Sequence, residues 1–155
     1  MPELAHAVND PVTATATQAV TQAMKETVPE TVLGFDFGLK RIGIAVGNTL
    51  LRQAQPLMII DAATNEAKFK AIDSLIAAWQ PTRCIVGLPL HPDGAEHAMT
   101  VRCRRFANQL HGRYSVTAIL VDERYSSAVL TQQRGERIDD RAAAVILQHY
   151  FDDLV

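Results

Sequence analysis

The hydrophobic positions between residues 31 and 60 follow the two-residue period of β-strands. Residues 31–37 (TVLGFDF) form an apolar run, and in residues 42–48 (IGIAVGN) large aliphatic side chains alternate with Gly and Ala. This alternation predicts a strand with one face of small residues, over which another element packs closely. Because only residues 38–41 join the two runs, they should pair as an antiparallel hairpin, and residues 55–60 (QPLMII) should add a third strand to form a meander.

Helical periodicity replaces the strand pattern after residue 60. An apolar stripe with a spacing of three and four residues comprises Phe69, Ile72, Leu75, Ile76 and Trp79. Pro81 should end this helix. Residues 83–88 (RCIVGL) are apolar without alternation, which is typical of a parallel strand covered on both faces.

A second helix is predicted after the loop GLPLHPDG. Asp93 and Glu96 have the spacing of a capping box, which places the helix start close to residue 93. The helix should end near Gly112, and residues 116–121 (VTAILV) should form the fifth strand. The apolar stripe of the second helix comprises Met99, Cys103, Phe106, Ala107 and Leu110. A last helix carries on one face Ala143, Ile146, Leu147, Tyr150, Phe151 and Leu154.

The order of these elements predicts an α/β fold. A three-stranded antiparallel meander is followed by two strands that are reached through helices, which gives a mixed five-stranded sheet with two parallel strands and helices on both faces. Right-handed crossovers would place the fourth strand beside the first and the fifth strand outside it. This arrangement is the architecture of the ribonuclease H-like fold.

The length of the chain, 155 residues, and its composition indicate one domain preceded by an extension. Residues 1–30 are rich in Thr, Ala and Gln and lack a bulky apolar stripe, so we expect a flexible N-terminal extension followed by a domain over residues 31–155. The formal net charge is -2, whereas residues 31–155 contain 14 basic and 13 acidic residues. Any contact with nucleic acid must therefore come from a local basic patch.

Cysteine and histidine positions give no metal-binding pattern. Cys84 and Cys103 lie within apolar patterns, which indicates buried thiols in a reducing compartment. The five histidines form no HxxxH or HExxH pair. No apolar run is long enough to span a membrane, and the N-terminus lacks the features of a signal peptide, so we expect a cytoplasmic protein that does not bind membranes.

Three acidic positions point to one edge of the predicted sheet. Asp36 ends the first strand, and Asp122 and Glu123 end the fifth, so one of that pair can converge with Asp36. At the start of the last helix, Asp139 lies on the stripe that packs against the sheet, whereas Asp140 lies about 100° around the helix. Asp139 is therefore the better candidate to face inward.

Three converging carboxylates would need cations to neutralise them. Hard oxygen ligands without Cys or His suit Mg²⁺ or Mn²⁺, and two such ions can hold the attacking and leaving oxygens of a phosphodiester. Each residue also has a structural interpretation. Asp36 could form an ion pair with Lys40 or Arg41, Asp139 or Asp140 could cap the last helix, and Glu123 could be a solvated surface acid.

Four motifs in order resemble the YqgF family, also called RuvX, a family of Holliday-junction resolvase-like proteins assigned as pre-16S rRNA nucleases. They cover residues 31–153 and read FDFGLKRIGIAVGN, CIVGLPLHPDGAE, VDERYSS and DDRAAAVILQHYF. The resemblance implies a ribonuclease H-like fold and hydrolysis of phosphodiester bonds that depends on a divalent metal. By motif, it implies that Asp36, Glu123 and Asp139 are the catalytic residues and metal ligands.

The chain departs from the family pattern between Ser127 and Asp139. This segment is shorter than the usual family loop and lacks the lysine that commonly precedes the helix aspartate. His91 stands where asparagine is frequent, and Ser127 replaces a common threonine. Because the shortened segment is a candidate substrate contact, the departure bears on substrate geometry more than on chemistry.

Basic residues lie next to the predicted acidic cluster, as contact with a phosphate backbone requires. The candidate nucleic-acid-binding residues are Lys40, Arg41, Arg124, Arg137 and Arg141. A second basic group on the preceding helix comprises Arg102, Arg104, Arg105 and Arg113. For this second group, solvated surface charge is the simpler interpretation.

The leading functional hypothesis is a nuclease that uses Mg²⁺ or Mn²⁺, acts on structured RNA and trims the 5′ end of pre-16S rRNA during ribosome biogenesis. One alternative is a nuclease that cleaves branched, four-way DNA junctions, which requires two sites on a homodimer. Another is a nucleic-acid-binding regulatory module without turnover. An ATPase of the actin type or a protein kinase would need further domains or motifs that this sequence lacks.

Overall fold

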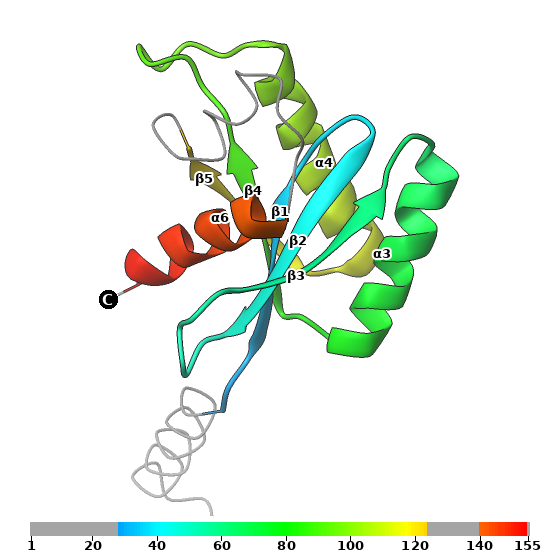
Figure 1. Cartoon of the computed structure of the whole chain (residues 1–155), viewed down its shortest axis with the longest axis vertical. Coiled ribbons are helices and arrows are strands. Elements are labelled where there is room, and N and C mark those ends of the chain that lie inside the picture. Colours follow the sequence, from blue (N-terminus) through cyan, green and yellow to red (C-terminus); the bar gives the residue numbers. More distant parts are fainter. Residues whose placement is uncertain (1–27, 124–139, 155) are drawn as a thin grey trace, which may run out of the picture.

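A computed structural model describes residues 28–123 and 140–154 of the protein (Figure 1). Five strands and three helices make up the described part of the chain. In chain order these elements are β1 (Thr31–Asp36), β2 (Arg41–Asn48), β3 (Gln55–Asp61), α3 (Asn65–Trp79), β4 (Arg83–Leu88), α4 (Ala98–Tyr114), β5 (Thr117–Asp122) and α6 (Asp140–Asp152). No helix in these residues is both long and apolar enough to cross a membrane.

The five strands form one mixed sheet in the order β3-β2-β1-β4-β5. β1 pairs with β2, and β2 with β3, in antiparallel orientation, which is the predicted meander. β4 pairs with β1, and β5 with β4, in parallel orientation. The predicted topology and fold class are thus confirmed, and β4 lies beside β1 as the handedness of crossover connections requires.

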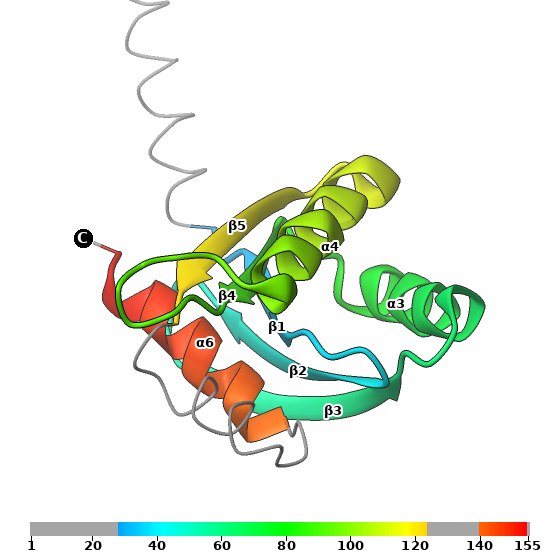
Figure 2. The same ribbon diagram turned by 90° about the horizontal axis from the view of Figure 1, so that it is seen from above.

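Helices cover both faces of the sheet. α3 and α4 lie on one face and α6 crosses the other, as Figure 2 shows from above. Each face has its own core, in which the large fully buried side chains include Phe35 and Phe106 on the α4 side and Ile146 and Phe151 on the α6 side. Burial on both sides explains why β4 has no polar alternation.

The face of small residues predicted on β2 is where α6 packs. A Cβ atom added to Gly47 would come within 2.6 Å of Phe151 Cε2, and one on Gly34 in β1 within 2.7 Å of Leu147 Cβ. Ala45 is fully buried in the same cluster. These positions need small residues because the helix approaches the strand backbone directly.

The predicted capping residue of α4, Asp93, was wrong by four residues. Asp93 and Glu96 do not form a capping box. Instead, His97 caps a helix that begins at Ala98, with a reciprocal bond to Thr100. The chain first closes a turn, in which Gly94 has a φ of 89°. A right-handed helix cannot pass through that conformation, so α4 begins after it.

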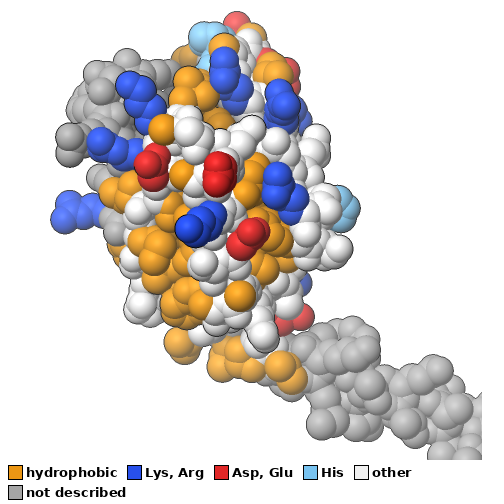
Figure 3. Space-filling view, turned by 90° about the vertical axis from the view of Figure 1, so that its right-hand side faces the viewer, with side chains coloured by type: hydrophobic (Ala, Val, Ile, Leu, Met, Phe, Trp, Pro, Cys, Tyr) orange, Lys and Arg blue, Asp and Glu red, His pale blue; other side chains and the backbone are white. Residues whose placement is uncertain are grey.

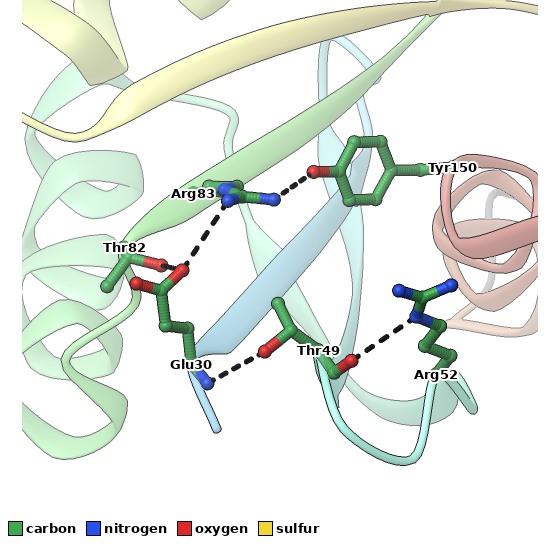
Figure 4. Close-up of polar contacts among 6 residues, drawn as sticks. All are labelled: Glu30, Thr49, Arg52, Thr82, Arg83 and Tyr150. Carbon is green, nitrogen blue, oxygen red and sulfur yellow. Dashed lines mark hydrogen bonds and ion pairs between the residues drawn. The ribbon is translucent and has the colours of Figure 1, made fainter. Parts of the chain in front are cut away.

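A polar network joins the ends of three elements at the edge of the sheet opposite the predicted acidic cluster (Figure 4). Glu30, the last residue of the predicted extension, binds Thr49 through its backbone N–H and Thr82 and Arg83 through its side chain. Arg83 also donates to the Tyr150 hydroxyl at 2.6 Å. Glu30 is therefore held against the domain, whereas residues 1–27 lie outside the described part of the chain.

Candidate active site

Asp36 is a buried carboxylate at the carboxyl end of β1. Its side chain lies on the α6 face, because Gly34, two residues earlier, packs against α6 and side chains alternate along a strand. Phe35 and Phe37 point to the opposite face, where both rings contact Phe106. Asp36 is 2% exposed. A carboxylate lies between two phenylalanines in the sequence because successive residues face different layers.

Glu123 is a second buried carboxylate, one residue beyond the end of β5. Its backbone N–H donates to the Leu88 carbonyl at 3.1 Å, which continues the pairing of β5 with β4. The side chain points to the α6 face and is also 2% exposed. Its Cγ would lie 3.5 Å from a Cβ placed on Gly87. The prediction that Glu123 is a solvated surface acid can be set aside.

Gly87 of β4 separates the two carboxylates. The register pairs Phe35 with Val86 and Gly87 with Val121, so Asp36 and Gly87 are at the same level of the sheet. Adjacent strands lie about 4.8 Å apart, which places β1 and β5 about 10 Å apart on either side of β4. Because Gly87 has no side chain, Ile146 of α6 packs directly on its backbone, between the strands that carry Asp36 and Glu123.

His149 of α6 contacts Glu123, which the sequence analysis did not predict. The Nδ1 atom of His149 lies 2.9 Å from Oε1 of Glu123, and as an ionised carboxylate only accepts, Nδ1 carries the proton. The hydrogen bond and the charge of Glu123 raise the pKa of His149 above its usual value. His149 lies three residues after Ile146, which is on the buried stripe, and this spacing was the signal in the sequence that could have placed His149 on the side of α6 that faces the sheet.

The other predicted site residues divide into described and undescribed ones. Arg141 is exposed in the first turn of α6. Asp139, Arg124 and Arg137 lie outside the described residues, so their roles remain predictions. The buried stripe of α6 agrees with the predicted one. Within residues 28–123 and 140–154, no group of three or more His, Cys, Asp or Glu side chains is arranged to hold a metal ion.

Lys40 and Arg41 form an exposed basic turn between β1 and β2 at the same edge of the sheet. They line a hollow of about 360 Å³ together with Ile59, Asp61 and Ala63. In the described part of the chain, neither side chain forms an ion pair with Asp36. The structure therefore excludes the alternative interpretation, in which Asp36 forms an ion pair with Lys40 or Arg41.

The sheet order and the helix layers define the class of protein as ribonuclease H-like. The structure is similar to that of Thermus thermophilus RuvC in complex with a Holliday junction substrate, with a TM-score of 0.50, 16% identity and coverage of 79% of this chain and 94% of that one. It is also similar to the fowlpox virus Holliday junction resolvase, with a TM-score of 0.51, 12% identity and coverage of 81% and 99%. At these identities the likeness establishes the fold.

Sequence similarity establishes the family. Residues 30–153 match the model of the RuvX family, described as Holliday junction resolvase, and the chain belongs to that family. A protein of Bordetella pertussis named as a pre-16S rRNA nuclease is 56% identical over 127 residues, which is 81% of this chain and 96% of that protein. One of Paraburkholderia phytofirmans with the same name is 48% identical over 130 residues, or 80% and 89%.

Proposed function

We propose that this protein is a nuclease that depends on a divalent metal and hydrolyses phosphodiester bonds in the 5′ precursor end of 16S rRNA. The observation that carries the proposal is the pair of buried carboxylates, Asp36 and Glu123, which lie on one face of the sheet at the ends of the two strands that flank β4. Membership of the RuvX family and the names of the bacterial relatives support the same activity.

The donor set fits Mg²⁺ or Mn²⁺. Buried carboxylate oxygens are hard ligands, and burial of two of them on one face is costly unless cations offset their repulsion. Asp36 and Glu123 would hold the ion, with Asp139 as the third predicted ligand. When bound, a metal ion of this type supplies an activated water molecule and stabilises negative charge on the phosphate.

The residues of the chain itself orient the site and the substrate. His149 donates to one oxygen of Glu123, which fixes the direction of that carboxylate. The burial of both acids between the sheet and α6 excludes bulk water from their inner side. The exposed cations Lys40, Arg41 and Arg141, with Arg124 and Arg137 as further predictions, would bind phosphates on either side of the bond to be cleaved.

The names of the relatives support RNA as the substrate. The chemistry of the site alone fits RNA and DNA equally. Structured RNA is the proposed partner, since the two bacterial relatives are named for a ribosomal RNA precursor. Processing of that precursor would take place in the cytoplasm, where the two free, buried thiols of Cys84 and Cys103 would stay reduced.

The experiment that tests the proposal is cleavage of an RNA that carries the 5′ precursor end of 16S rRNA, with Mg²⁺ or Mn²⁺. Wild type should cleave it, and Asp36→Asn and Glu123→Gln should not. Glu66→Gln is the matched control, because this acid lies in the first turn of α3, away from the site. Equal activity of Asp36→Asn and Glu66→Gln would contradict the proposal.

Cleavage of four-way DNA junctions is the second candidate, because the family is described as Holliday junction resolvase. Two symmetric incisions require two sites, and hence a homodimer. A junction substrate in the same assay, together with the mass measured by light scattering, separates the two functions. Junction-selective cleavage by a dimer would favour the resolvase. Binding of both substrates without cleavage would favour the regulatory module.

A further inference from the structure

A basic pocket lies on the face of the sheet opposite the two carboxylates. It has a volume of about 240 Å³ and lies between the turn after β1 and the helices α3 and α4. The side chains that matter to its chemistry are Phe37, Asn65, Lys68, Arg102, Arg105 and Gln109. Among the described residues that line it there are three cations and no Asp or Glu. We call this the basic pocket.

Lys68 is the unusual member of the basic pocket because it is 8% exposed. Its Nζ atom lies 4.9 Å from the ring centre of Phe69 and 5.8 Å from that of Phe37. No carboxylate in residues 28–123 or 140–154 lies within ion-pair distance of it. Buried lysines are nearly always paired with an acid, so this one needs a different explanation.

Aromatic rings compensate only part of the cost of burying this ammonium group. Burial and the nearby charges of Arg105 and Arg113 lower the pKa of Lys68 below its usual value. Arg113 cannot move away without loss, since its guanidinium lies 3.6 Å from the ring centre of Phe69. The fold therefore holds like charges together around a cavity, and an anion in that cavity would relieve the repulsion.

The donors around the basic pocket match the oxygens of a phosphate group. Guanidinium groups bind phosphate through paired N–H donors, and an ammonium group adds a point charge. Arg102 and Arg105 both lie on α4 and are exposed, and within the described residues neither has a carboxylate partner. Arg104, by contrast, is paired with Glu96 at 2.7 Å. Of these three neighbouring arginines, the two that line the pocket are those without a carboxylate partner in the described residues.

The basic pocket is continuous with the edge that carries the carboxylates. Phe37 and Gly38, which line it, directly follow Asp36 in the chain. Ala63 lines both the basic pocket and the hollow beside Lys40 and Arg41. Figure 3 shows Lys and Arg side chains over the upper part and the middle of this side of the molecule, with Asp and Glu side chains among them.

We propose that the basic pocket binds a phosphate group of the nucleic-acid strand that passes over the turn between β1 and β2. Lys68, Arg102 and Arg105 contact the phosphate oxygens, and Asn65 and Gln109 add amide donors. The strand would then be held on one side of β1 while Asp36 acts on the other. That the phosphate belongs to the bound strand rests on the proposed function, whereas binding of the anion does not.

The test measures binding of the precursor RNA and of inorganic phosphate separately, in EDTA so that no cleavage occurs. Anisotropy of a labelled RNA is recorded over a range of salt concentrations for wild type, Arg105→Gln and Lys68→Met. Arg104→Gln and Lys70→Met are matched controls on the same helices. The NMR chemical shifts of the backbone amides of Gly38 and Leu39 report the binding of inorganic phosphate. Sodium chloride at equal ionic strength is the reference.

We expect Arg105→Gln and Lys68→Met each to weaken RNA binding about 10-fold at low salt. Each should also lower the slope of log Kobs against log salt by about one, because one phosphate contact is lost. The amide shifts caused by phosphate should disappear in both variants. The two control variants should behave as wild type.

Other outcomes would overturn the proposal. Equal losses in Arg104→Gln would mean that only the general charge of α4 matters. Loss of phosphate binding with unchanged RNA affinity would make the pocket a site for free phosphate or a nucleotide. Lys68→Met should keep or raise the melting temperature, because a desolvated charge is removed, so failure to fold is not expected to obscure the result. If the two pocket variants lose RNA binding but the wild type does not cleave RNA, the proposed function is contradicted and the role of the basic pocket in binding is not.

Discussion

The two faces of the sheet at the end of β1 bury charges of opposite sign. On the α6 face, Asp36 and Glu123 are each 2% exposed. On the α3 and α4 face, Lys68 is 8% exposed among arginines. Burial of charge is costly, and like charges in one place add repulsion, so each cluster favours a ligand of opposite sign. The acidic face suits metal cations and the basic face suits phosphate, as the two proposals above require.

The largest expected effect comes from removing a carboxylate of the acidic face. Loss of a partner that merely supports a metal ligand costs about 10–100-fold in activity, so Asp36→Asn and Glu123→Gln should each cost more than about 100-fold. In EDTA the same variants should have a higher melting temperature than wild type, because repulsion between buried carboxylates is reduced. Calorimetry with Mn²⁺ should show weaker binding. A variant with unchanged Mn²⁺ affinity would contradict the role of that residue as a ligand.

A smaller loss is expected when the support of Glu123 is removed. His149→Ala should lower the cleavage rate and the affinity for Mn²⁺ by about 10–100-fold, because Glu123 loses the donor that orients it. His149→Asn should restore most of both, since its amide N–H occupies nearly the position of Nδ1. His149→Gln, whose amide lies farther from the backbone, should restore less. Equal behaviour of the Asn and Gln variants would argue against a role in positioning.

The close packing of α6 between the carboxylates can be tested through Gly87. A Cβ at this position would lie 2.6 Å from Ile146 Cδ1, so Gly87→Ala must displace α6 or its side chain. We expect a loss of about 1–3 kcal/mol in the free energy of unfolding, together with reduced cleavage. Gly112→Ala is the control, since nothing lies within 4 Å of its Cβ. As a helical glycine it should gain about 0.5–1 kcal/mol in urea unfolding.

The smallest expected effect concerns the buried thiols. Burial raises the pKa of both Cys84 and Cys103 to about 12, and the charge of Asp36 adds to the effect on Cys103. Above about pH 9 the unfolded chain loses these protons while the folded chain keeps them, so stability falls as the pH rises. Urea unfolding at pH 8 and pH 10 should show a larger decrease for wild type than for a Cys84→Ala, Cys103→Ala double variant. Equal decreases would show that the raised pKa values of the two thiols do not cause the loss of stability.

The sequence analysis placed the acidic face better than the basic one. Because parallel strand ends meet at one edge, topology placed Asp36 near either Asp122 or Glu123, and the family motif then selected Glu123. Lys68 lies four residues before Ile72 and seven before Leu75, so helical spacing places it on the buried face of α3, but spacing does not show which groups surround it. Apart from Phe69, its aromatic and cationic neighbours come from the turn after β1 and from α4, which only packing brings to it.

The spacing of acidic residues before α4 led to a wrong prediction of the residue that caps this helix. Asp93 and Glu96 have capping-box spacing, yet Asp93 accepts a bond from the Ala95 N–H within a turn, and Glu96 pairs with Arg104. His97 caps the helix instead. The turn that includes Gly94 decided the outcome, since its backbone conformation excludes a helix at that point.

The sequence by itself determined the order of the strands and helices and the small-residue face of β2, because these depend on short-range spacing and on backbone geometry. It also carried the family motifs, which are short runs of particular residues. The tertiary structure alone determined the contacts between residues far apart in the chain. His149 and Glu123 are 26 residues apart, and Arg83 and Tyr150 are 67 apart. A spacing pattern shows which side of an element faces the core, but the partner across the core depends on how the layers pack.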